Sequence, residues 1–284
     1  GDEVIIFQPY WVSFPDFVSV TGAKPVFVNT DKRKQFEPNF KDLKNKINNK
    51  TKGIIINSPS NPTGGVWSNK AILKTLEICK QYDLWVFSDE CYEQLTYNKP
   101  FQSIASLTKK NKKIITFQSC SKTYAMTGWR IGYLAGDQEL VANISKLQGQ
   151  STSCPNSIAQ HAAIEALIGD QAAVYNMKNI FHIRRNLIID LLKAMPNVDC
   201  EVPNGAFYVF PNFEHYIGGK QKNGKRINNA KDLSLYFLDE TGVVSVDGDS
   251  FGAPNYIRFS YATSEEVITK AMHLIQGALK KISF

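Results

Sequence analysis

The chain has 284 residues, of which 43% are hydrophobic and 21% are charged, a balance typical of a globular protein with a sizeable core. Lys and Arg number 33 against 26 Asp and Glu, and the excess lies in lysine-rich stretches without interleaved aromatic residues. No apolar run reaches 18 residues, and the four histidines show no metal-ligand spacing. The sequence therefore predicts a solvated basic surface rather than a nucleic-acid partner, and neither a membrane span nor a metal site.

The five cysteines are odd in number and contain no C-x-x-C pair. This pattern favours reduced thiols over a disulfide framework. No signal peptide is visible either, so we expect a cytoplasmic location.

Apolar, β-branched runs alternate with helical patterns over the first half of the chain. The predicted strands lie at 25–28, 53–57, 84–90, 113–119 and 131–136. After the second of them, Ile72, Leu76 and Cys79 recur at helical spacing behind Ser68, a candidate N-cap. Continuous apolar strands separated by helices indicate a mostly parallel sheet with both faces covered. The predicted fold class is therefore α/β, with a doubly wound sheet.

The second half of the chain begins with helices and ends in a mixture of short elements. Amphipathic patterns predict helices at 159–168 and 176–195. The later predicted elements are a helix at 230–241, strands at 243–246 and 256–262, and a last helix from 264. We therefore predict two domains, a large one at 1–174 and a smaller α+β domain at 175–284.

Polar side chains follow three of the predicted strands, where each strand ends. Open parallel sheets place ligands at the carboxyl ends of their strands, so we expect these side chains to converge. They are Asn61, Asp89, Tyr92, Ser119, Ser121 and Lys122. An amine, a carboxylate, a phenol and an amide would thus share one edge of the sheet.

This set of groups suits pyridoxal phosphate. A lysine amine forms a Schiff base with the aldehyde of that cofactor, as Lys122 would. Asp89 would keep the ring nitrogen protonated, while Tyr92 and Asn61 would hydrogen-bond the ring hydroxyl. The phosphate would be held by hydroxyls and a guanidinium close in sequence, namely Ser119, Ser121 and Arg130. The hypothesis requires the side chains of Lys122 and Asp89 to open into one cavity.

Four motifs, in order, resemble the landmarks of class I (fold-type-I) pyridoxal phosphate-dependent aminotransferases. They are "NSPSNPTGG" (57–65), "SDECYE" (88–93), "SCSKTYAMTGWRIG" (119–132) and "IRFSYA" (257–262). The resemblance extends over nearly the whole chain and is closest to bacterial aspartate aminotransferases. It implies that Lys122 is the Schiff-base lysine and moves the proton, that Trp11 stacks on the cofactor, and that Arg258 grips the substrate carboxylate. Trp11 and Asn61 would also border the substrate.

Each of these side chains also has a plainer explanation. Lys122 could be a surface lysine and Trp11 a core aromatic residue, while Arg130 and Arg258 could each belong to a structural ion pair. Asp89 could cap a turn or helix. The four motifs together favour the catalytic interpretation.

The resemblance implies amino transfer from L-aspartate to 2-oxoglutarate by a ping-pong mechanism, in a homodimer. Aromatic amino acids or prephenate stay open as substrates, as does another pyridoxal phosphate reaction such as C–S lysis. A non-catalytic, cofactor-binding regulatory module is a further alternative. Family members carry a longer N-terminal portion, and we expect that portion to be missing before Gly1.

Overall fold

The computed structural model describes residues 1–98, 100–108 and 111–284. Its main element is a seven-stranded sheet with the order β3-β2-β1-β4-β5-β6-β7. The strands are β1 (Glu3–Gln8), β2 (Lys24–Asp31), β3 (Glu37–Pro38), β4 (Thr51–Asn57), β5 (Trp85–Asp89), β6 (Ile114–Ser119) and β7 (Gly132–Ala135). The central strands pair in parallel, and only β3 and β7 run antiparallel to their neighbours. The predicted α/β class with a mostly parallel sheet is confirmed.

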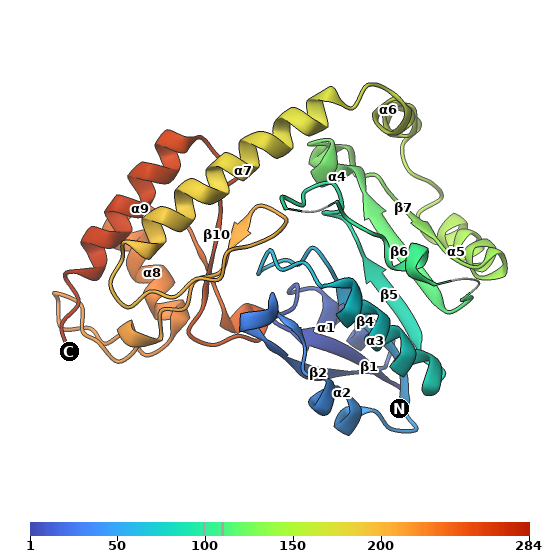
Figure 1. Ribbon diagram of the computed structural model, residues 1–284, viewed down its shortest axis with the longest axis horizontal. Helices are drawn as coiled ribbons and strands as arrows, with labels where there is room; N and C mark the ends of the chain where they lie inside the picture. The colour runs from blue at the N-terminus through green and yellow to red at the C-terminus, as the bar shows by residue number, and fades with distance from the viewer. Residues whose placement is uncertain (99, 109–110) are drawn as a thin grey trace.

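Helices flank this sheet (Figure 1). They are α1 (Phe14–Val20), α2 (Phe40–Lys46), α3 (Asn69–Gln81), α4 (Cys120–Thr123), α5 (Gln138–Ser151) and α6 (Ser157–Ile168). The predicted cap of α3 is present, because Ser68 Oγ accepts a hydrogen bond of 3.2 Å from the backbone N–H of Ala71. Ile72, Leu76 and Cys79 are buried in the same cluster as the strand residues of β4 and β5. Helical spacing therefore identified the buried face of α3 correctly.

The long helix α7 (Ala172–Lys193) leads from beside α6 into the C-terminal part of the chain (Figure 1). That part contains β8 (Tyr208–Val209), α8 (Ala230–Thr241), β9 (Val246–Asp247), β10 (Ile257–Ser260) and α9 (Glu265–Leu279). The three short strands form an antiparallel sheet with the order β8-β10-β9. The predicted boundary at residue 174 lies in the first turn of α7, and the division into two domains stays a prediction.

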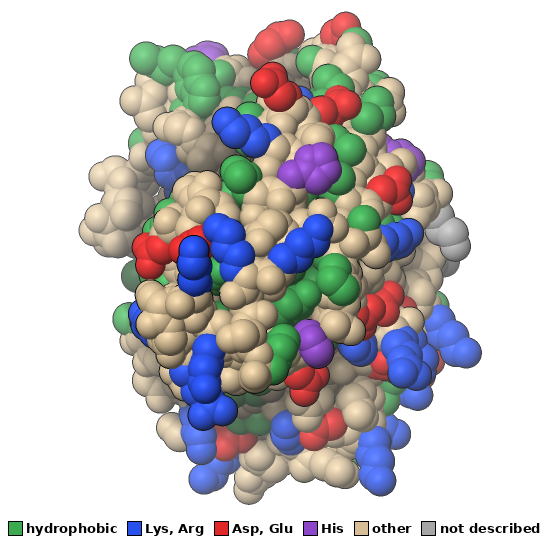
Figure 2. Space-filling model, turned by 90° about the vertical axis from the view of Figure 1, so that its left-hand side faces the viewer, with side chains coloured by type: hydrophobic (Ala, Val, Ile, Leu, Met, Phe, Trp, Pro, Cys, Tyr) green, Lys and Arg blue, Asp and Glu red, His purple; other side chains and the backbone are tan. Residues whose placement is uncertain are grey.

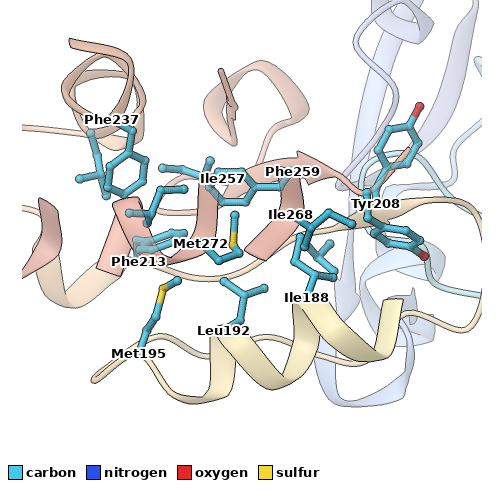
Figure 3. Close-up of a cluster of buried hydrophobic side chains, with 14 of the residues drawn as sticks. Ile188, Leu192, Met195, Tyr208, Phe213, Phe237, Ile257, Phe259, Ile268 and Met272 are labelled. Atoms are coloured by element: carbon cyan, nitrogen blue, oxygen red, sulfur yellow. The ribbon is translucent and has the colours of Figure 1, made fainter. Parts of the chain in front are cut away.

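A large hydrophobic cluster joins this small sheet to the helices α7, α8 and α9. Figure 3 shows part of it, with Ile188, Leu192, Phe213, Phe237, Ile257 and Met272 pointing toward one another. All six side chains are at most 3% exposed. Burial of this size anchors β8 and β10 firmly, and these two strands carry side chains of the candidate site.

The surface of the C-terminal part is mixed in charge. Figure 2 shows Lys and Arg side chains interspersed with Asp, Glu and uncharged side chains on this face. No helix in the described part of the chain is long and apolar enough to cross a membrane. The same residues contain no group of three or more His, Cys, Asp or Glu side chains that could hold a metal ion.

Candidate active site

A cavity of about 690 Å³ opens at the carboxyl ends of β4, β5 and β6 and extends to the small sheet. All the side chains that the sequence singled out line it, namely Trp11, Asn61, Asp89, Tyr92, Ser119, Ser121, Lys122, Arg130 and Arg258. Lys122 and Asp89 therefore open into the same space, as the hypothesis requires. The structure brings the candidate residues together in one cavity.

Asn57, the last residue of β4, positions the loop that carries Asn61. Its Oδ1 atom accepts a hydrogen bond of 2.8 Å from the backbone N–H of Asn61. Its Nδ2 atom donates to the backbone carbonyl of Asp89 at 3.3 Å, which ties the loop to the neighbouring strand. Sequence analysis did not single out Asn57, although the asparagine at a strand end was a visible signal.

Asp89 and Tyr92 form the inner wall of the cavity, at the end of β5. An Oδ1 atom of Asp89 accepts a hydrogen bond of 3.1 Å from the backbone N–H of Cys91. Burial raises the pKa of the Asp89 carboxyl above its ordinary value. Burial likewise raises the pKa of the Tyr92 phenol. A cation in the cavity beside Asp89 would stabilise its charged form.

Lys122 lies in α4, a helix of four residues that begins directly after β6. Ser119 caps this helix, because its Oγ atom accepts a hydrogen bond of 3.1 Å from the backbone N–H of Ser121. The Nζ atom of Lys122 lies 5.9 Å from the ring centroid of Phe207. No carboxylate forms an ion pair with Lys122 among the described residues. The amine thus faces the cavity without an acidic partner.

Arg130 follows the short 3₁₀ helix η3 (Thr127–Trp129) and has a left-handed backbone, with φ of 51°. Non-glycine residues pay about 1 kcal/mol for this conformation, so the surrounding fold imposes it. One guanidinium nitrogen donates to the carbonyl of Thr127 at 2.9 Å. The remaining donors of Arg130 are available to an anion in the cavity.

Arg258, from β10, lies between two aromatic rings. Its guanidinium carbon is 4.6 Å from the ring centroid of Tyr208 and 5.0 Å from that of Phe251. One Nη atom donates to Asn61 Oδ1 at 2.8 Å, whereas the buried Nε atom has no hydrogen-bond partner in the described part of the protein. Burial lowers the pKa of Arg258.

Neither Arg130 nor Arg258 forms an ion pair with a described carboxylate. The plainer explanation of a structural ion pair therefore does not hold for either arginine. Arg258 is partly buried and Arg130 is exposed. A cation that is shielded from water and lacks a counterion among the described residues is costly, so the end of the cavity at Arg258 is suited to a negatively charged ligand.

Trp11 follows β1 and forms the outer, aromatic wall. Its ring packs edge-on against Phe14 at 5.4 Å and against Phe17 at 5.7 Å between centroids. It is partly exposed rather than buried, and it lines the cavity, so it is more than a core residue. A flat ligand would have an aromatic surface available there.

The donor set fits pyridoxal phosphate. A free amine, a partly buried carboxylate and a phenol surround one end of the cavity, while Arg130 and the hydroxyls of Ser119 and Ser121 suit a phosphate. The second arginine, Arg258, stays available for another anion.

Comparison with known proteins identifies the family. The family model described as "Aminotransferase class I and II" matches residues 1–275. A probable aspartate/prephenate aminotransferase of Aquifex aeolicus (strain VF5) is 39% identical over 99% of this chain and 71% of its own length. An aspartate aminotransferase of Bacillus subtilis (strain 168) is 40% identical over 99% of this chain and 71% of its own length.

Solved structures agree with the sequence relatives. The aspartate aminotransferase from Rhizobium meliloti superposes with a TM-score of 0.95 at 38% identity, covering 100% of this chain and 72% of its own. The aromatic aminotransferase from Pyrococcus horikoshii OT3 gives 0.91 at 36% identity, covering 99% of this chain and 74% of its own. The chain belongs to the class I and II aminotransferases, and it is an aminotransferase of the pyridoxal phosphate-dependent, aspartate aminotransferase-like kind.

Proposed function

We propose that the protein binds pyridoxal phosphate in this cavity and transfers the amino group of L-aspartate to 2-oxoglutarate. The observation that carries the proposal is one shared cavity, lined by Lys122, Asp89 and Arg258, an arginine without a counterion among the described residues. The names of the relatives support aspartate as donor. When bound, pyridoxal phosphate supplies a reactive aldehyde and an electron-withdrawing ring.

Side chains at the carboxyl edge of the main sheet would hold and polarise that group. The Lys122 amine would bind the aldehyde and, once free again, would accept and return the proton of the substrate Cα. The Asp89 carboxylate, whose pKa burial raises, would hold a proton at the ring nitrogen, and the resulting cation would offset that effect of burial. Tyr92 would donate a hydrogen bond to the ring oxygen. The phosphate would be held by three donors, namely Ser119, Ser121 and Arg130.

Arg258 binds the substrate. Its planar guanidinium can bond both oxygens of the α-carboxylate, and the hydrogen bond to Asn61 sets the orientation of the fork. The two flanking rings exclude water, which strengthens the ion pair. Because Lys122 lines the same cavity, a substrate held at Arg258 would have its Cα proton in the space that the Lys122 amine faces.

An aromatic or prephenate donor is the second candidate. The outer wall of the cavity is formed by Trp11, Phe14 and Phe17, and Phe17 is 56% exposed. Such a wall favours a substrate with a ring, as the name of the Aquifex aeolicus relative also suggests. Comparing kcat/KM for aspartate, phenylalanine and the amino acid formed from prephenate decides between the two.

We also propose that two copies of the chain form a homodimer. The helices α5 and α6 expose large apolar side chains, with Leu147 72%, Ile158 68% and Ile168 79% exposed. In the described structure no residue of α5 is buried, which is unusual for a helix of a globular protein. Light scattering across a concentration series tests the proposal, and a protein that stays monomeric would contradict it.

A cytoplasmic location is likewise a proposal. It is supported by the cysteines, all five of which are free. Fractionation of cells that express the protein tests it, and recovery outside the cytoplasm would contradict it.

The decisive experiment removes the amine. Lys122→Ala should abolish the visible absorbance of the covalently bound cofactor and the formation of oxaloacetate. Lys70→Ala, which removes an exposed lysine of α3, should change neither. An unchanged spectrum in Lys122→Ala would refute the proposed function. Pyruvate and ammonia formed without an oxo acid would indicate C–S lysis instead, and a bound cofactor without turnover would indicate a regulatory module.

A further inference from the structure

Tyr208, which the sequence analysis did not single out, lies where the small sheet meets the cavity. It is the first residue of β8, pairs with Ser260 of β10, and is only 6% exposed. Figure 3 shows its ring at one end of the cluster of buried side chains, far from Phe237 and Met195. Tyr208 also lines the cavity. Its side chain is therefore fixed on one side by the core and faces the site on the other.

The side chain of Tyr208 contacts two residues of the candidate site. Its hydroxyl shares a hydrogen bond of 2.9 Å with the hydroxyl of Tyr92. The face of its ring lies 4.6 Å from the guanidinium carbon of Arg258. Tyr92 reaches the cavity from the main sheet and Arg258 from the small sheet. Tyr208 thus joins the two halves of the site through one rigid ring.

The hydrogen bond between the two phenols has a preferred direction. Burial raises the pKa of both hydroxyls, so both carry their protons at neutral pH. For Tyr208 the hydrogen bond with Tyr92 opposes that rise in pKa, and so does the positive charge of Arg258, which lies over the ring of Tyr208 and not over that of Tyr92. The Tyr208 hydroxyl is therefore the better donor. When Tyr208 donates, the hydrogen of Tyr92 is left to point into the cavity.

We propose that Tyr208 is a positioning residue for the amino transfer: its hydroxyl directs the Tyr92 hydrogen into the cavity, and its ring holds the Arg258 guanidinium against Asn61. This inference rests on the proposed function, because it assigns ligands to Tyr92 and Arg258. The hydroxyl and the ring of Tyr208 would therefore have separate effects. The hydroxyl acts on the cofactor side and the ring acts on the carboxylate side.

Two substitutions separate these parts. Tyr208→Phe keeps the ring and removes the donor, whereas Tyr208→Leu removes both. Tyr236→Phe is the matched control, since this buried tyrosine also uses its hydroxyl, in a hydrogen bond of 2.9 Å to the carbonyl of Ala278, and does not line the cavity. The readouts are the pH midpoint of the visible band of bound pyridoxal phosphate and the dissociation constant of maleate, a dicarboxylate without an amino group.

Loss of the Tyr208 donor would weaken the hydrogen bond from Tyr92 to the ring oxygen of the cofactor. The ring oxygen would then attract the proton on the cofactor-bound Lys122 nitrogen more strongly, so this proton would be lost only at higher pH. In Tyr208→Phe we expect the pH midpoint to rise by about half a unit, a free-energy change smaller than that of one typical hydrogen bond. Its affinity for maleate should stay within about twofold of the wild type, because the ring contact remains. In Tyr208→Leu the midpoint should rise equally, and maleate should bind about five- to tenfold more weakly.

The outcomes distinguish this inference from the proposed function. A wild-type protein without a pyridoxal phosphate band would refute both. A wild-type band whose midpoint is the same in Tyr208→Phe would refute the role of the hydroxyl alone. Maleate affinity in Tyr208→Leu equal to that of the wild type would refute the role of the ring. A shift of the pH midpoint in Tyr236→Phe as large as that in Tyr208→Phe would refute the role of the Tyr208 hydroxyl, because it would show a general effect of removing a buried hydroxyl.

Discussion

Replacing Arg258 by lysine tests how the site recognises carboxylates, because the charge is kept and the planar fork is lost. Lysine cannot bond two carboxylate oxygens in one plane while also donating to Asn61, as Arg258 does at 2.8 Å. The lost charged hydrogen bond is worth about 1.5–3 kcal/mol. Weaker contact with the rings at 4.6 and 5.0 Å adds about 0.5–1 kcal/mol. A total of about 2–4 kcal/mol corresponds to a fall in kcat/KM of about 30- to 900-fold.

The assay follows oxaloacetate formed from aspartate and 2-oxoglutarate, with NADH-dependent reduction of the product as readout. Arg226→Lys, at an exposed arginine that does not line the cavity, serves as the matched control and should keep its activity within twofold. The visible band of the bound cofactor should persist in Arg258→Lys, since the side chains proposed to hold the phosphate and the ring lie elsewhere in the cavity. A loss of less than threefold with an intact band would refute the assignment of Arg258 as the main carboxylate partner.

Three further predictions concern the fold and its titratable groups. Leu192→Ala, at a fully buried side chain of α7, should lower the free energy of unfolding by about 3–5 kcal/mol in urea denaturation. His182 Nε2 accepts a hydrogen bond of 2.7 Å from the guanidinium of Arg185, and burial, followed by that positive charge, lowers the pKa of His182. As pH falls, His182 takes up a proton in the unfolded chain before it does so in the folded protein, so the free energy of unfolding should fall as pH drops below about 6.5. His182→Gln should make this dependence of the free energy of unfolding on pH less steep. Burial raises the pKa of the Cys200 thiol to about 12, so iodoacetamide at pH 8 should alkylate the exposed Cys154 much faster.

Each of these predictions has a control or a contradicting result. Leu274→Ala removes a leucine of α9 that is 40% exposed, and it should change the free energy of unfolding by about 0.5 kcal/mol or less. A pH slope that is equally steep in wild type and His182→Gln would show that other groups dominate acid unfolding. Peptide mass spectrometry that finds Cys200 alkylated as fast as Cys154 would show that its surroundings open readily.

Local patterns in the sequence were enough to predict five of the seven strands of the main sheet and residues that line the candidate site. Apolar, β-branched runs identify buried strands because both faces of a parallel sheet are covered. The site residues follow those strands directly or lie in recognisable motifs, which is why the side chains from Trp11 to Arg258 could be grouped without coordinates. The placement of residues that follow predicted strands or lie in motifs is therefore accessible from sequence.

The C-terminal part was harder to predict, because its strands are defined by long-range pairing. A strand was predicted at 243–246, whereas β9 spans Val246–Asp247, where the chain pairs with Ile257 and Arg258 of β10. β8 has only two residues and was not predicted as a strand. The contact of Tyr208 with Tyr92 joins residues that are 116 positions apart, and no local pattern reports it.

The left-handed backbone of Arg130 was equally inaccessible from sequence. No glycine or asparagine marks that position, and the conformation follows from the fold around η3.

The hydrogen bond between Asn61 and Arg258 spans 197 positions of the chain. During synthesis, the groups proposed to hold the cofactor would all leave the ribosome well before the strand that carries Arg258. A nascent chain could therefore bury its first sheet and still be unable to grip a carboxylate. The ability to bind an amino acid would arise only in the final stage of translation, when β10 is made. An amino acid bound at Arg258 would then hold β10, the last strand to be made, against the main sheet, which is made first.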